Sequence, residues 1–156
     1  MKLTSNAFLN GEFIPTQYTC DGNDLSPQLH WTGEPENTKS FVLIVDDPDA
    51  PMGNWDHWLL FNIPSDINQL KEAFSKLPSG TKEGKNSWEK TGYGGPCPPS
   101  NIHRYFFKLY ALDTLLSLEN GATKDQLIQA MQGHVLAQAE LMGRYERQRN
   151  LGTCTE

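Results

Sequence analysis

The sequence predicts a mainly β protein, an antiparallel sheet or sandwich with an α-helix near the C-terminus packed on it. Three long apolar runs, 41–45, 57–63 and 104–112, are typical of buried strands. Helical spacing of apolar residues occurs only in the last third of the chain. Strands that come first and a helix that comes last, joined by short connections, favour this class. We expect one domain over 1–150 and a frayed tail over 151–156.

Each predicted strand has its own signal. Phe41–Val45 is a continuous β-branched and aliphatic run, as expected of a strand covered on both faces. The run 57–63 ends at Pro64, and 104–112 is the third long strand. Near the N-terminus, Asn10-Gly11 is the pair that tight hairpin turns prefer.

The helix is predicted to begin at Thr123, which with Gln126 fits a capping box. Apolar residues then recur at helical spacing and mark one face for the core: Leu127, Ile128, Met131, Val135, Ala139 and Met142. Gly133 within such a helix costs about 1 kcal/mol relative to alanine. We therefore expect it to pack closely against a neighbouring element, and the polar chain after Arg147 to fray.

Composition excludes several classes of protein. The formal charge is −6 and no basic run occurs, which argues against binding to nucleic acid or to an anionic membrane surface. No apolar run approaches the ~20 residues that span a bilayer, and the N-terminus lacks a secretory signal, unless one has already been removed. Three cysteines suit a reducing compartment, so we expect free thiols and a cytoplasmic location.

The segment 65–102 is predicted to be an ordered loop that builds a pocket. It is rich in glycine and proline, and Gly92-Tyr93-Gly94-Gly95-Pro96 leaves the backbone unobstructed. Consecutive amides in such a loop can converge on an anion as a nest. Trp55, Trp88 and Tyr105 could supply apolar walls, although aromatic residues at strand edges are more often core.

Three ionisable side chains lie at the ends of the predicted strands. Asp47 follows the first strand, whereas His57 and His103 open the second and third. Adjacent strands would bring these ends together, and protonatable imidazoles beside free amides describe a small anion site. We expect Asp47 to raise the histidine pKa, Asp49 to make the local turn, and Ala50-Pro51 to be a cis peptide.

These segments together resemble a known family, the phosphatidylethanolamine-binding proteins, in their bacterial Raf-kinase-inhibitor-like branch. The matching motifs are Asp47-Pro48-Asp49-Ala50-Pro51, Trp55-Asp56-His57, the Gly94-Gly95-Pro96-Cys97-Pro98-Pro99 loop and His103-Arg104-Tyr105. Segments 18–22 and 133–137 also look like the bacterial branch. The resemblance implies a large antiparallel sheet packed on a smaller one with flanking helices.

The resemblance also implies a ligand pocket and a function. The residues expected to bind the ligand are Asp47, Trp55, His57, Gly94, Gly95, Pro96, His103 and Tyr105. The expected function is non-catalytic binding of a small phosphorylated or carboxylate ligand, with modulation of a partner such as a kinase. No cofactor is implied.

Other functions remain open at this point. Asp47, His57 and His103 could ligate zinc or iron with open positions, as in a metal-dependent hydrolase. Cys97 with His103 could be a nucleophile and its base. A structural or dimerisation module, such as a homodimer without a ligand, is the remaining alternative.

Overall fold

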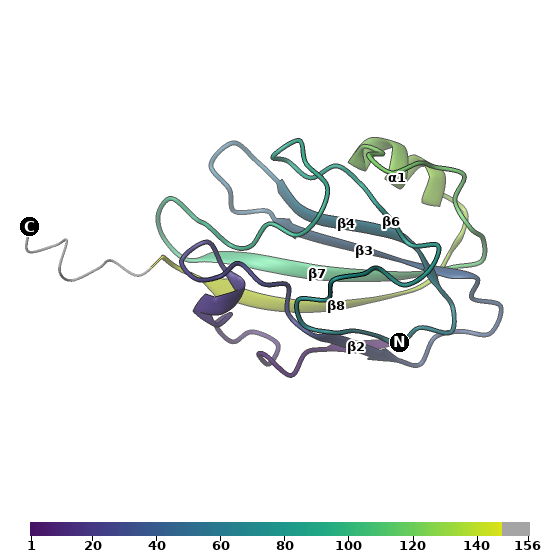
Figure 1. Cartoon of the computed structure of the whole chain (residues 1–156), viewed down its shortest axis with the longest axis horizontal. Coiled ribbons are helices and arrows are strands. Elements are labelled where there is room, and N and C mark those ends of the chain that lie inside the picture. Colours follow the sequence, from purple (N-terminus) through teal and green to yellow (C-terminus); the bar gives the residue numbers. More distant parts are fainter. Residues whose placement is uncertain (148–156) are drawn as a thin grey trace, which may run out of the picture.

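A computed structural model describes residues 1–147 of the chain (Figure 1). It contains eight strands, one 3-10 helix and one α-helix within this range. In chain order these are β1 (Lys2–Thr4), η1 (Thr16–Tyr18), β2 (Leu29–Thr32), β3 (Ser40–Asp47), β4 (Trp55–Pro64), β5 (Gln69–Leu70), β6 (Lys82–Glu83), β7 (His103–Leu112), α1 (Lys124–Met131) and β8 (Val135–Tyr145).

The strands form a large and a small antiparallel sheet, as predicted. The five-stranded sheet has the order β6-β4-β3-β7-β8, and the three-stranded sheet has the order β1-β2-β5. Figure 1 shows the large sheet as the middle layer, with the small sheet on one side and α1 on the other. The long strands β3, β4 and β7 lie where the three apolar runs predicted them.

The central strand β3 is buried along its whole length because both faces of the large sheet are covered. Phe41, Leu43 and Val45 pack toward the small sheet, in one core with Trp31 and Trp58. The alternate residues Val42 and Ile44 join a second core with Leu127 and Met131 of α1. This alternation explains why the run carries no polar residue until it reaches Asp46.

The predicted C-terminal helix is present but is much shorter than expected. The capping box at Thr123 and Gln126 forms, and the helix ends at Met131. Gly133 has a φ of +81° and no atom lies within 4 Å of where its Cβ would be, so it turns the chain rather than packing closely. Beyond it the chain is strand β8, in which burial alternates from Ala139 onward.

Two further local predictions concern the turn at Asn10-Gly11 and the peptide bond between Ala50 and Pro51. The turn at Asn10-Gly11 forms, with the Glu12 amide donating to the Leu9 carbonyl, but its flanks bond to β8 and not to each other. The Ala50–Pro51 bond is trans, so the predicted cis peptide is wrong. The tail expected to fray, including 151–156, lies outside the described residues.

No helix within residues 1–147 is both long and apolar enough to cross a membrane. The segment 65–102 includes the short strands β5 and β6 and is otherwise irregular. It is held by specific hydrogen bonds: Asn86 Oδ1 accepts from the amides of Trp88 and Lys90, and Asn86 Nδ2 donates to the Gly92 carbonyl. It is therefore an ordered loop.

Candidate functional site

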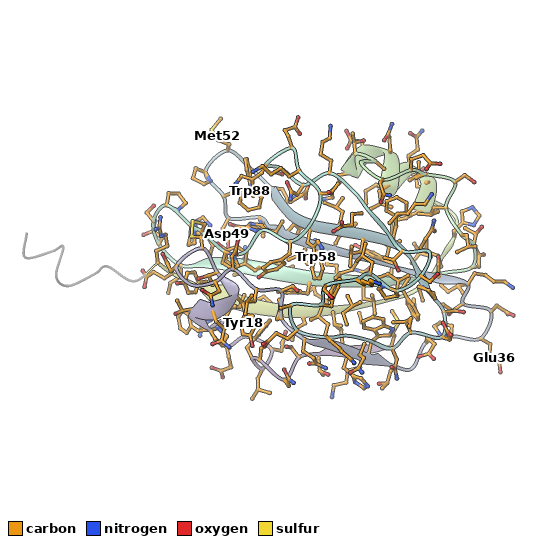
Figure 2. The ribbon with its side chains drawn as sticks, viewed as in Figure 1. Tyr18, Glu36, Asp49, Met52, Trp58 and Trp88 are labelled. Atoms are coloured by element: carbon orange, nitrogen blue, oxygen red, sulfur yellow. A yellow bond between two sulfur atoms is a disulfide. The ribbon has the colours of Figure 1, made fainter. Side chains whose placement is uncertain are left out.

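A cavity of about 270 Å³ opens at the end of the large sheet where β3 ends and β7 begins. Its deep polar residues are Asp47, His57, His103 and Tyr105. Its other lining residues are Ala50, Pro51, Met52, Trp55, Trp88, Cys97, Pro98 and Pro99. Figure 2 shows Met52 at the outer tip of the loop after β3, on the same side as Trp88. The structure thus brings together five of the predicted site residues.

A β-bulge in β4 aims two of these residues into the cavity. Val45 pairs with Trp58, but the next residue, Asp46, pairs with Asp56, so His57 is the extra residue on its strand. If His57 instead paired with Asp46 and the register continued without a bulge, the side-chain alternation would direct Trp55 to the α1 face of the sheet. With the bulge, Trp55 lies opposite Asp47 and lines the cavity, while Asp56 meets Lys124 of α1 on the other face.

Asp47 holds the floor of the cavity through two hydrogen bonds. Its Oδ2 accepts from Nδ1 of His103 at 2.6 Å, and both side chains are buried. Its Oδ1 accepts from the Asp49 amide at 2.8 Å, which makes the local turn. The turn carboxylate is therefore Asp47 and not Asp49. Asp49 instead binds the exposed Arg104 side chain, and this hydrogen bond lowers the pKa of Asp49 to about 2.

His57 is buried and its tautomer is defined by the backbone. Its Nδ1 lies 2.6 Å from the Gly94 carbonyl oxygen, which can only accept, so Nδ1 carries the hydrogen. Burial lowers the pKa of His57, and the Gly94 carbonyl with the nearby carboxylates of Asp47, Asp56 and Asp24 offsets this only in part. The prediction of a raised pKa is therefore wrong for His57, whose Nε2 is a hydrogen-bond acceptor in this neutral form.

Tyr105 lies against both imidazoles. The His57 ring meets it edge-on, with centroids 5.2 Å apart, and the His103 ring stacks on it at 6.4 Å. Its hydroxyl is buried and has no hydrogen-bond partner among the described residues. Burial and the charge of Asp47 raise the pKa of Tyr105, so the phenol keeps its proton. A buried donor without a partner is costly, which marks this hydroxyl as a candidate ligand contact.

The glycine loop supports the cavity in a different way from the one predicted. The Gly94 amide donates to the His57 carbonyl and the Gly95 amide to Asp24 Oδ1, so neither is free to form an anion nest. The Pro96 carbonyl accepts from the Cys20 amide. Gly94 and Gly95 line a neighbouring cavity of about 330 Å³ that also contains Asp24 and Lys90. A Cβ at Gly94 would lie 2.3 Å from the Trp88 ring, so close packing requires this glycine.

Cys20 and Cys97 form a disulfide, and the prediction of free thiols is wrong for both. The bond joins the loop after η1 to the loop that precedes β7, across 77 residues of sequence, and Cys97 lines the cavity. Cys154 lies outside the described residues. The cysteines therefore no longer support the expectation of a reducing compartment.

Several lining residues were missed by the sequence analysis. Ala50, Pro51 and Met52 form one side of the rim and Pro98 and Pro99 another. Met52 is 93% exposed. An exposed methionine within a proline-rich turn is a signal that could have been noticed, whereas Trp88 was considered only as a wall.

Both hydrolase chemistries lose their structural support. No three His, Cys, Asp or Glu side chains within residues 1–147 are arranged to hold a metal ion, so Asp47, His57 and His103 do not form the suggested ligand set. The sulfur of Cys97 is bonded to Cys20 and is not a free nucleophile.

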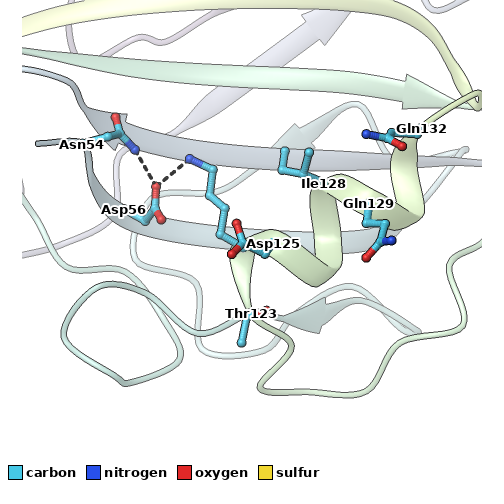
Figure 3. Close-up of a pocket in the computed structure, with 8 residues that line it drawn as sticks. Asn54, Asp56, Thr123, Asp125, Ile128, Gln129 and Gln132 are labelled. Atoms are coloured by element: carbon cyan, nitrogen blue, oxygen red, sulfur yellow. Dashed lines mark hydrogen bonds and ion pairs between the residues drawn. The ribbon is translucent and has the colours of Figure 1, made fainter.

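A larger, open hollow of about 620 Å³ lies on the opposite face, beside α1 (Figure 3). Two of its charged residues are paired with each other: Asp56 Oδ1 accepts from Asn54 Nδ2 at 3.0 Å and from Lys124 Nζ at 2.8 Å. Burial opposes the charge of Lys124, but Asp56 and Asp46 outweigh it and raise the Lys124 pKa. Because its lysine is already paired with Asp56, this hollow is the weaker candidate for an anion.

Comparison with known proteins gives a consistent family relationship. The family model described as phosphatidylethanolamine-binding protein matches residues 4–146. A UPF0098 protein of Methanothermobacter thermautotrophicus is 52% identical over 150 residues, which cover 94% of this chain and 99% of that one. A UPF0098 protein of Aquifex aeolicus is 51% identical over 152 residues, which cover 94% of this chain and 89% of that one.

Two crystal structures share the fold. The phosphatidylethanolamine-binding protein homologue CT736 of Chlamydia trachomatis superposes with a TM-score of 0.89 at 45% identity, covering 94% of this chain and 97% of that chain. YbcL of E. coli, described as a member of the mammalian family, superposes with a TM-score of 0.88 at 35% identity, covering 94% and 98%.

Proposed function

Because this chain belongs to the phosphatidylethanolamine-binding protein family, we propose that its cavity binds the phosphoryl group of a small ligand without transforming it. The observation that carries the proposal is the buried Asp47–His103 pair at the cavity floor. A carboxylate and an imidazole are expensive to bury together unless the site uses them.

The pair supplies a donor for an anion. Nδ1 of His103 is occupied by Asp47, and no hydrogen bond within the described residues uses its Nε2. With a proton on both nitrogens, His103 would donate from Nε2 to a phosphoryl oxygen while Asp47 balances the positive charge. The buried Tyr105 hydroxyl supplies a second donor. Hydrogen bonds to a charged group of this kind contribute about 1.5–3 kcal/mol each.

Binding without catalysis fits the reactive groups at hand. Cys97 is held in the disulfide, and the raised pKa of Tyr105 keeps the phenol from acting as an oxyanion nucleophile. The apolar rim of Pro51, Met52 and Pro98 would cover the non-phosphoryl part of a ligand. These groups would orient a ligand and exclude water from it.

The test is titration of methyl phosphate into ¹⁵N-labelled protein at pH 6, followed by NMR. We expect shift changes confined to the ends of β3, β4 and β7, and roughly 10- to 100-fold weaker binding for His103→Ala. The matched control is His134→Ala, which removes an exposed histidine paired with Asp113 far from the cavity and should bind normally. Absence of binding by the wild-type protein, or equal losses in both variants, would contradict the proposal.

A further inference from the structure

The polar groups of the cavity define which protonation state of a phosphoryl ligand they can accept; this inference rests on the proposed function. Three of them face the ligand with a free hydrogen-bonding position: Nε2 of His57, Nε2 of His103 and the hydroxyl of Tyr105. Asp47 is occupied by His103 and by the Asp49 amide. The question is which of the three donate and which accept.

His57 accepts. The Gly94 carbonyl fixes the hydrogen on Nδ1 and leaves a lone pair on Nε2. A second proton on this ring would place a positive charge among the rings of Trp88 and Tyr105, where the side chain is almost fully buried. The fully ionised form of a phosphate monoester has only lone pairs on its oxygens. It would therefore set a lone pair against the lone pair of His57.

Cationic side chains that could compensate are missing from the described cavity wall. The lining residues, all within the described part of the chain, include neither lysine nor arginine. The amides of Gly94 and Gly95 already donate to the His57 carbonyl and to Asp24. When His103 carries a proton on both nitrogens, as the proposed function requires, His103 and Tyr105 are donors beside one acceptor, His57. That set matches an anion that carries one hydrogen.

We propose that the cavity selects the singly protonated form of a phosphate monoester, whose own O–H donates to Nε2 of His57 while its other oxygens accept from His103 and Tyr105. The ligand class is then a monoester monoanion. A phosphodiester, such as the phosphate of a lipid headgroup, carries one negative charge but no O–H on phosphorus. The two sources of a phosphoryl group are therefore distinguishable by this single hydrogen.

The titration of the protein itself must be separated from that of the ligand. His57 is faced by the carboxylates of Asp47, Asp56 and Asp24, and His103 by those of Asp47 and Asp49, with Tyr105 beside both rings. Changes in the charge of these groups alter the binding of all monoanions in the same direction. A ratio of two affinities measured at the same pH removes most of this contribution.

The experiment measures dissociation constants of methyl phosphate and dimethyl phosphate by NMR from pH 5 to pH 8. A phosphate monoester loses its second proton near pH 6, so methyl phosphate becomes a dianion above it whereas dimethyl phosphate does not change. We expect methyl phosphate to bind more tightly at pH 5. Its advantage should then fall about tenfold per pH unit above pH 6, roughly 100-fold by pH 8. Sulfate, a dianion without a hydrogen, should bind weakly throughout.

His57→Phe is the informative variant, because a phenyl ring keeps the aromatic contacts with Trp88 and Tyr105 and removes the acceptor. In this variant the advantage of methyl phosphate should stay constant with pH, and sulfate should gain relative affinity. A merely structural role of His57 would weaken all three probes alike and leave the ratios unchanged.

The possible results separate this inference from the proposed function. A methyl phosphate advantage that rises with pH, or tighter binding of dimethyl phosphate at pH 5, would overturn the inference and leave phosphoryl binding intact. No binding of any probe at millimolar concentration would overturn the proposed function itself. The ligand comparison uses the wild-type protein, so it does not depend on whether the variant folds.

Discussion

Oδ2 of Asp47 lies 2.6 Å from Nδ1 of His103, and Oδ1 of the same carboxylate lies 2.8 Å from the Asp49 amide nitrogen. One buried side chain thus fixes both the turn after β3 and the orientation of an imidazole on β7. Asp47→Asn should lower the free energy of unfolding by about 1–3 kcal/mol, because an amide has one acceptor oxygen for two donors. Urea denaturation at pH 7 measures this.

The control for that substitution is Asp49→Asn, the same chemical change two residues away. Asp49 pairs with the exposed Arg104, and exposed ion pairs contribute little to stability. The Asp49 variant should therefore lose less stability and keep its affinity for methyl phosphate. Tighter phosphate binding by Asp47→Asn would show that Asp47 only repels the ligand.

His57 should remain neutral, with its hydrogen on Nδ1, when the pH falls just below 6.5, the usual pKa of histidine. Long-range ¹H–¹⁵N spectra recorded from pH 8 to pH 5 report both the tautomer and the midpoint. Since the folded-state pKa is lowered, the unfolded chain binds a proton first as the pH falls through 6.5. The wild-type protein should therefore lose stability in this window relative to His57→Gln. A titration midpoint above 6.5 would contradict the assignment.

Gly94→Ala should lower the free energy of unfolding by about 1–3 kcal/mol, because a Cβ there would lie 2.3 Å from the Trp88 ring. The cost should shrink when the same substitution is made in a Trp88→Ala background. A double-mutant cycle measured by urea denaturation gives this coupling. Equal costs in the two backgrounds would mean that another contact of Gly94 is responsible.

Replacement of Cys20 and Cys97 by serine should lower the free energy of unfolding by about 2–4 kcal/mol, since the disulfide closes a loop of 77 residues. The affinity for methyl phosphate should also fall because Cys97 lines the cavity. Cys154→Ser is the matched control, as it changes the cysteine content and leaves this bond intact. Non-reducing mass spectrometry of purified protein tests the bond directly; alkylation of both cysteines would disprove it.

The main strands could be predicted because a strand buried on both faces requires an uninterrupted apolar run, as in Phe41–Val45. The length of the helix could not. Val135 and Ala139 are four residues apart and fit a helical face, yet Ala139, Leu141 and Tyr145 also fit the alternation of a strand. The left-handed conformation of Gly133 decided between the two, and a glycine in the sequence is compatible with either.

For the cavity, ionisable residues at strand ends were a usable signal because Asp47 and His103 lie at neighbouring ends of β3 and β7. The disulfide was not predicted, because three cysteines in the sequence are typical of a reducing compartment and of free thiols. Nor was the role of Gly94. The sequence alone does not distinguish a glycine whose amide binds an anion from a glycine that is required for close packing against a tryptophan.

His57, the extra residue in β4, could be lost in evolution without disturbing the strand pairing around it. Trp58–Phe61 and Ile63, which follow it, belong to the two cores, whereas Trp55 lies before it and His57 is the extra residue itself. Loss of His57 itself would close the bulge and leave Asp56 opposite Asp46 and Trp55 opposite Asp47, so both side chains would stay on their present faces. The strand pairing and one ligand contact are thus carried by separate residues. A single-codon deletion there would preserve the sheet and the Trp55 wall while removing one imidazole from the cavity.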